Sequence, residues 1–186
     1  MMSRPMPGAT SKVLKTQLLT AKAFAPYGEV IDRQQHTHFL INGGSTERYH
    51  QMACVDTGPE DGRAIISIFR KPVASHFPFR VEMMEQHPFG SQAFIPLKGK
   101  PFLILVAASA QAAEQGDLAL FLSDGSQGIN YAAGTWHHPL ITLEDDDELL
   151  VVDRQGDRKN CNEIQLPDSS DIWVPAILIQ GASLPS

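Results

Sequence analysis

The feature that most constrains this fold is a succession of short apolar runs, each ended after a few residues by Gly, Pro, Asn or Asp. Such turn residues recur at intervals of roughly 8–12 residues, a spacing typical of β-sandwiches and β-barrels. The clearest predicted strands are residues 65–70, 79–84, 92–97, 102–107, 118–122 and 149–153. We therefore predict an all-β fold, a barrel with one or two short helices.

Only two segments favour a helix. Thr20 can cap one turn over residues 21–25, which Pro26 and Gly28 then end. The second candidate is the alanine-rich stretch 107–115. Neither is long enough to change the fold class.

The chain has 186 residues, and one domain is the natural reading, since most domains run ~100–200 residues. Residues 1–12 contain Pro, Ser and Thr and are predicted to be a disordered tail. Residues 13–166 form the main domain, and residues 167–186 form a C-terminal extension beginning at a break in the apolar pattern. We expect the apolar segment 172–179 to cover a barrel edge or to pair with another subunit, because an exposed apolar edge invites aggregation.

Charge and composition exclude several functional classes. The net charge is −6, the acidic excess is concentrated in residues 144–148, and no basic stripe suited to nucleic acid is present. No apolar run approaches the ~20 residues of a membrane helix, and the N-terminus lacks the apolar stretch of a signal peptide. Cys54 and Cys161 lie far apart and form no C-x-x-C pair, which favours free thiols in a reduced cytoplasm.

A set of candidate ligands follows from residue spacing. Glu85 and His87 share a strand face, because strand side chains alternate. Gln92 precedes Gly99 by seven residues, and residues 134–137 read G-x-x-H, ending in His137. This is a degraded form of the two metal-binding motifs of cupin barrels, in which Glu85 and Gln92 replace the usual ligands.

Two readings of this set stay open. As a mixed nitrogen and oxygen site, Glu85, His87, Gln92 and His137 suit a divalent first-row metal such as nickel, although Gln is a poor ligand. Alternatively, His87 and His137 are hydrogen-bonded barrel histidines that hold no metal. Lys98 has the strand parity of Gln92, which predicts that it too faces the cavity.

Longer segments give the chain a more specific resemblance, to the ureidoglycolate lyase family. The similarity runs from about residue 14 to residue 166. It is carried by the segments 24–28 (FAPYG), 47–50 (ERYH), 85–99 (EQHPFGSQAFIPLKG), 127–131 (QGINY), 134–140 (GTWHHPL) and 152–154 (VDR).

The resemblance implies a cupin-like β-barrel, usually dimeric, that splits ureidoglycolate into glyoxylate and urea in allantoin degradation, a part of purine catabolism. The expected partner is thus a small-molecule substrate, with no nucleic acid and no membrane. Three rivals remain at this stage. A non-catalytic cupin would bind a small organic acid, a cupin oxygenase would use Glu85, His87 and His137 as a facial triad, and a hydrolase would release ammonia in place of urea.

The substrate's chemistry assigns roles to particular residues. Its carboxylate calls for a cation, and Arg48 and Arg70 are candidates, although each is equally well explained as a solvated charge at a strand end. Lys98 would pair with the same carboxylate or stabilise the developing carbonyl.

The remaining roles concern protons and the cavity wall. A hydroxyl proton must leave and the urea nitrogen must gain one, a task for His50, His87, His137 or Glu85. Gln92 and Tyr131 are expected to contact substrate or line the cavity. His138 is expected to point away from His137 and to have a structural role.

Overall fold

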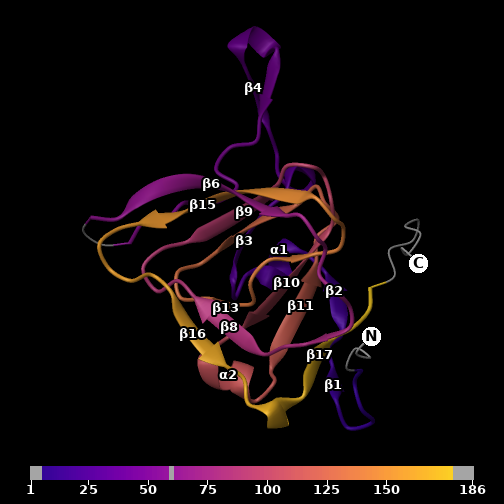
Figure 1. The fold of residues 1–186 in the computed structure, drawn as a ribbon. Helices are drawn as coiled ribbons and strands as arrows, with labels where there is room; N and C mark the ends of the chain where they lie inside the picture. The colour runs from indigo at the N-terminus through magenta and orange to yellow at the C-terminus, as the bar shows by residue number, and fades with distance from the viewer. Residues whose placement is uncertain (1–5, 59–60, 178–186) are drawn as a thin grey trace.

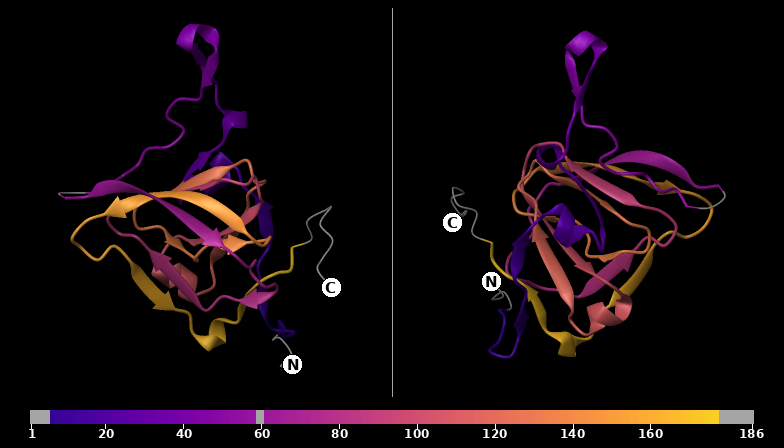
Figure 2. Two further views of the ribbon diagram at one scale, coloured as in Figure 1. Left: turned by 45° about the horizontal axis from the view of Figure 1, so that its top comes forward. Right: turned by 180° about the vertical axis from the view of Figure 1, so that it is seen from behind.

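The computed structural model describes residues 6–58 and 61–177, and its body consists of two facing β-sheets (Figures 1 and 2). One sheet has the strand order β16-β8-β13-β10-β11-β2, with β14 also paired to β10. Its strands are β2 (Thr16–Leu18), β8 (Met83–Gln86), β10 (Phe102–Ala107), β11 (Leu118–Leu122), β13 (Trp136–His137), β14 (Ile141–Thr142) and β16 (Asn162–Gln165). The facing sheet has the order β3-β12-β9-β15-β6. Its strands are β3 (Gly28–Ile31), β6 (Arg63–Lys71), β9 (Gln92–Pro96), β12 (Gly128–Tyr131) and β15 (Asp147–Gln155).

Smaller elements complete the fold. A three-stranded sheet joins β1 (Lys12–Val13), β17 (Ile172–Val174) and β7 (Phe79–Arg80) in the order β1-β17-β7. The helices are α1 (Ala21–Phe24) and α2 (Ala110–Glu114), with 3₁₀ turns η1 (Arg33–Gln35), η2 (Asn42–Gly44) and η3 (Asp168–Ser170). Strands β4 (Phe39–Ile41) and β5 (Thr46–Arg48) form a hairpin, the arm, which stands away from both large sheets (Figures 1 and 2).

The all-β prediction is confirmed, and the sheets face each other without closing into a barrel. Within the described residues the strand pairings join no member of one large sheet to a member of the other. The open edges are β6 and β3 on one sheet and β16 and β2 on the other. A closed barrel would have removed these edges.

Strand β10 is buried on both of its faces. Its alternate residues Phe102, Ile104 and Val106 enter the core between the two large sheets. Leu103, Leu105 and Ala107 enter a second core, which also contains Ala113 of α2 and Ile172 and Val174 of β17. A strand covered on both faces reads as a continuous apolar run, as this one does.

Several predicted elements occur where the sequence placed them. Strands β10 and β11 have the predicted bounds, and Thr20 caps α1 by accepting a hydrogen bond from the Ala23 amide. The predicted helix 107–115 is shorter, because residue 107 belongs to β10 and Ser109 caps α2 at Ala110. The predicted strand 79–84 is two strands, β7 and β8, which belong to different sheets.

The two ends of the chain meet in the small sheet. Lys12 pairs with Ile172 and Val13 with Trp173, so β17 pairs within its own chain, with β1 and β7. Residues 1–5 of the predicted tail and 178–186 of the predicted extension lie outside the described residues. No helix among the described residues is long and apolar enough to cross a membrane.

Candidate active site

Three predicted residues, Glu85, His87 and His137, come together between the sheets. Strand β8 carries Glu85, the chain after β8 carries His87, and the neighbouring strand β13 carries His137 directly opposite Glu85. The distance from His137 Nε2 to Glu85 Oε1 is 3.6 Å, and the two imidazole centroids are 5.3 Å apart. One ligand atom from each of the three residues lies within 4.8 Å of the others. We call these residues the Glu-His-His cluster.

Backbone carbonyls orient both histidines of this cluster. His87 Nδ1 lies 2.6 Å from the carbonyl oxygen of Asn160, and His137 Nδ1 lies 2.9 Å from that of Thr135. A carbonyl only accepts, so each Nδ1 carries a proton, and in the neutral form of each ring Nε2 presents the lone pair. Both Nε2 atoms are buried and lack a hydrogen-bond partner. The imidazoles also hold the pKa of Glu85 below its ordinary value, chiefly through His137, so this carboxylate is ionised at neutral pH.

A cavity of about 310 Å³ opens on the side of Glu85 and His137. Tyr131 stacks on His137 with ring centroids 4.2 Å apart, and burial raises the pKa of its phenol, which therefore stays protonated. Phe69, Phe94, Phe102, Leu103, Pro139 and Leu140 supply an apolar wall. We call this space the first cavity, and its size suits a small organic acid.

Lys71 is a cavity residue that the sequence analysis missed. It lines the first cavity beside Glu85 and His137, and its ammonium forms no ion pair with any of the described residues. Strand alternation was the available signal, because Phe69 and Lys71 share the face of β6 that turns toward Phe94. An unpaired cation at the wall of a small cavity is suited to a carboxylate ligand.

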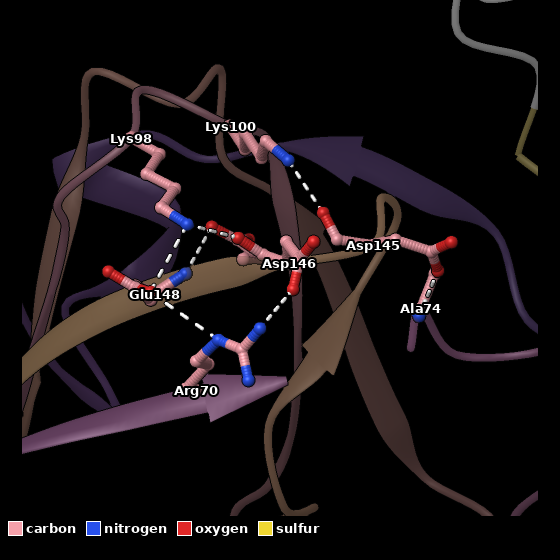
Figure 3. A network of polar contacts seen from close by, with 8 residues as sticks. Arg70, Ala74, Lys98, Lys100, Asp145, Asp146 and Glu148 are labelled. Atoms are coloured by element: carbon pink, nitrogen blue, oxygen red, sulfur yellow. Dashed lines mark hydrogen bonds and ion pairs between the residues drawn. The ribbon is translucent and has the colours of Figure 1, made fainter. Parts of the chain in front are cut away.

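Arg70, one of the two arginines that the sequence offered as candidates, also lines the first cavity, but its guanidinium is engaged at the rim. Its guanidinium contacts Asp146 and lies 3.5 Å from Glu148 (Figure 3). Lys98 joins the same network, since its Nζ is 2.7 Å from the Asp146 carbonyl oxygen and 3.2 Å from Glu148 Oε1. Lys98 lies two residues beyond the end of β9 and lines neither this cavity nor the one described next.

A second cavity, of about 320 Å³, lies on the His87 side of the cluster. Gln92 lines it together with His87, so the structure brings Gln92 next to the cluster, as the sequence predicted. The Gln92 side chain is buried, and its Oε1 has no hydrogen-bond partner.

Arg48 and His50 are not brought to either cavity of their own chain. Arg48 ends β5 in the arm, with its guanidinium 6.0 Å from the centre of the Phe39 ring. His50, two residues further on, packs edge-on against the same ring, with the two ring centroids 6.0 Å apart.

His138 differs from the expectation that it points away from the site. It packs against Phe79, as a structural residue would, yet it also lines the first cavity with His137. Its Nδ1 lies 2.8 Å from the Pro139 carbonyl oxygen, and burial lowers its pKa, so the imidazole is neutral at neutral pH. Strand β13 ends at His137, so the alternation of side chains between the two faces of a strand does not apply to His138.

The Glu-His-His cluster has the composition and orientation of a metal-binding site. Its donors are one carboxylate and two imidazole nitrogens, a set that suits divalent first-row ions. The Nδ1–H···O=C bonds are the outer contacts that ligating histidines usually have. The donors that are present therefore fit such an ion.

Comparison with known proteins shows the family to which the chain is similar. Residues 11–173 match the model of a family described as ureidoglycolate lyase. The chain is 50% identical over 157 residues to a ureidoglycolate lyase of Pseudomonas entomophila, covering 84% of this chain and 93% of the relative. It is 49% identical over 152 residues to one of Azotobacter vinelandii, covering 82% and 91%. It is 51% identical over 152 residues to one of Pseudomonas putida, covering 82% and 90%.

Proposed function

We propose that this chain, which belongs to the ureidoglycolate lyase family, cleaves ureidoglycolate into glyoxylate and urea. The observation that carries the proposal is the placement of an ionised carboxylate, the neutral imidazole of His138 and an unpaired ammonium around one small cavity. The reaction moves a proton from the hydroxyl oxygen to the departing nitrogen while the C–N bond breaks. It needs no water and no oxidant, which separates it from the hydrolase and oxygenase alternatives.

Lys71 is the residue that holds the substrate carboxylate. Arg70 already contacts the carboxylates of Asp146 and Glu148, whereas Lys71 forms no ion pair with any of the described residues. Apolar side chains line the cavity beside Lys71, and a charge-assisted hydrogen bond to the substrate is stronger in such surroundings.

His138 carries the proton. Its lowered pKa keeps the imidazole neutral and able to accept the hydroxyl proton of the carbinolamine. The imidazolium then protonates the nitrogen as the C–N bond breaks, which releases urea and leaves glyoxylate. The carboxylate of Glu85 contributes favourably to the charged form of His138 in this step.

A divalent first-row metal such as nickel is part of the proposal, held by Glu85 and by Nε2 of His87 and His137. When bound, it would supply a Lewis acid to polarise the hydroxyl oxygen. Support comes from the two buried Nε2 atoms that lack a partner and from the fixed tautomers of both rings.

The test is to incubate purified protein with ureidoglycolate and to assay urea, glyoxylate and ammonia together. Equal amounts of urea and glyoxylate without ammonia are expected. Ammonia in proportion to glyoxylate would make the protein a hydrolase, and binding without turnover would make it a sensor. The His138→Gln variant, which keeps hydrogen-bonding capacity without titrating, should lose ~10²–10⁴ in kcat.

The protein acts as a homodimer in this proposal, and two exposed apolar surfaces support it. In the arm, Phe39 and Leu40 are 49% and 60% exposed. On edge strand β6, Ile66 and Ile68 are 73% and 62% exposed. Apolar surface of this kind on an unpaired edge invites another chain.

A second copy would cover both surfaces and receive the arm. Arg48 and His50 would then be carried onto the partner, which gives a place to the roles that the sequence predicted for them. Leu40→Asp and Ile68→Asp should each shift the protein toward monomer in light scattering. The control is Leu18→Asp, which is 73% exposed on β2 of the other sheet and should leave the mass unchanged. A wild-type monomer would end the dimer proposal.

We also place the protein in the cytoplasm. Its two cysteines are free, as is usual in a reducing compartment. Fractionation of the cells that produce it, with enzyme activity as the marker, tests this.

A further inference from the structure

The second cavity differs in character from the first. Both adjoin the Glu-His-His cluster, the first through Glu85 and His137 and the second through His87. The ligand atoms of these residues lie within 4.8 Å of one another, so only the width of the cluster separates the two spaces. A substrate whose central carbon lies at the cluster would have one end directed toward each cavity.

Two acceptor atoms in the second cavity lack a partner. Val152 of β15 pairs with Ala93 of β9, which makes the next residues, Asp153 and Gln92, neighbours on the same face. Gln92 is only 6% exposed, and both its Oε1 and the Oδ1 of Asp153 are buried without a hydrogen bond. Buried polar side-chain atoms are nearly always hydrogen-bonded, so two unpaired acceptors at one cavity wall indicate a ligand that donates.

Charge decides which end of the substrate enters the second cavity. A carboxylate would be repelled by Asp153 and attracted by Lys71 in the first cavity. The arginines that line the second cavity are held by other groups. Arg154 donates to the Thr57 carbonyl oxygen and to Asp61, and Arg158 lies over the Phe89 ring. The ligand best matched to this space is neutral and rich in N–H donors.

We infer that the second cavity is the subsite for the ureido group, in which Gln92 and Asp153 accept hydrogen bonds from its N–H groups. The inference rests on the proposed function and deepens it. The carboxylate end lies at Lys71, the carbinol carbon at the Glu-His-His cluster and the ureido end at Gln92 and Asp153. After the C–N bond breaks, urea occupies the second cavity and glyoxylate the first.

Inhibition by the two products, urea and glyoxylate, tests the two ends of the substrate site separately. Gln92→Met and Asp153→Leu replace the acceptors with apolar groups of similar length, and each should weaken inhibition by urea by about tenfold, the effect of one lost hydrogen bond. Inhibition by glyoxylate should change by less than about twofold in both variants. Gln165→Met makes the same chemical change at an exposed position of β16 and should alter neither constant.

A second measurement uses only the wild-type protein and needs no turnover, so it does not depend on whether the variants fold. Cys161 lines the second cavity, whereas Cys54 is exposed and lines neither cavity. In the wild-type protein, urea below unfolding concentrations should slow alkylation of Cys161 relative to Cys54, and glyoxylate should not. Equal alkylation with and without urea, or equal weakening of both inhibitors in the variants, would overturn the inference.

Failure of the inference and failure of the proposed function remain distinguishable. A wild-type protein that releases no urea from ureidoglycolate refutes the proposed function, whatever the labelling shows. A wild-type protein that releases urea, but whose Gln92 and Asp153 variants keep normal urea inhibition, refutes the subsite alone.

Discussion

Replacing Lys71 with Met tests how the first cavity holds its substrate. The change keeps most of the apolar stem and removes the ammonium, so the Phe69 and Phe94 wall around it is preserved. Lys71 forms no ion pair within the described residues, and the variant therefore breaks no ion pair among them.

The expected rise in KM can be estimated from the interaction between the Lys71 ammonium and the substrate carboxylate. Two unit charges ~4 Å apart attract by about 4 kcal/mol at an effective dielectric constant of 20. Desolvation of both groups lowers the net contribution to about 1.5–3 kcal/mol, the range for hydrogen bonds to charged groups. That free energy corresponds to an increase in KM of roughly 10- to 150-fold.

Steady-state rates of glyoxylate formation give KM and kcat separately. If Lys71 only holds the carboxylate, KM should rise and kcat should stay nearly constant. Lys100→Met is the matched control, because Lys100 lies 3.6 Å from Glu144 outside the cavity and should leave both constants unchanged. An unchanged KM in Lys71→Met would refute the assignment of the carboxylate to this end of the cavity.

Three further predictions concern the metal and stability. Chelation should lower activity, a divalent first-row ion should restore it, and His137→Ala should bind no metal in elemental analysis; full activity in a demonstrably metal-free protein would contradict this. Hydrogen bonds from Ser11 and Trp173 lower the pKa of Asp171, so it stabilises the fold above the unfolded-state pKa of about 3.8, and this contribution is lost as pH falls through the lower folded value. Asp171→Asn should therefore flatten the dependence of Tm on pH in that acid range, and an unaltered slope would count against it. Phe121 is 1% exposed and packs edge-on against Phe24, so Phe121→Ala should lower the free energy of unfolding by about 3–5 kcal/mol in denaturant titrations, and a loss below about 1 kcal/mol would show that the site collapses.

The fold was most predictable where a short apolar run could only be a buried strand. Strands β10 and β11 have the bounds predicted from sequence, because their apolar runs end at turn residues on both sides. The split between β7 and β8 was not predictable from periodicity. Val81, between them, donates to the Ile172 carbonyl oxygen, a contact 91 positions away in the sequence. The sequence pattern records that a residue is buried, and it does not record which sheet buries it.

Spacing and strand parity were useful inside a strand and gave no guidance beyond its end. The seven-residue spacing to Gly99 placed Gln92 with the cluster, and parity applied to β6 puts Lys71 on the same face as Phe69. Lys98 has the same parity as Gln92, but β9 ends at Pro96 and the chain then turns at Gly99, where φ is +66°. Lys98 consequently reaches the Asp146 and Glu148 network at the rim (Figure 3).

The orientation of the two cluster histidines depends on contacts that the spacing of the motif residues does not show. Asn160 lies 73 positions beyond His87, and its carbonyl oxygen fixes the His87 tautomer. Thr135 does the same for His137 from two positions away, and Tyr131 holds that ring in a stack with an interplanar angle of 14°. With each Nδ1 proton committed to a carbonyl, each Nε2 lone pair is available to the space beside Glu85. The spacing of Glu85, His87 and His137 therefore identifies the donors, while the carbonyl oxygens of Asn160 and Thr135 decide which nitrogen each imidazole offers to metal or substrate.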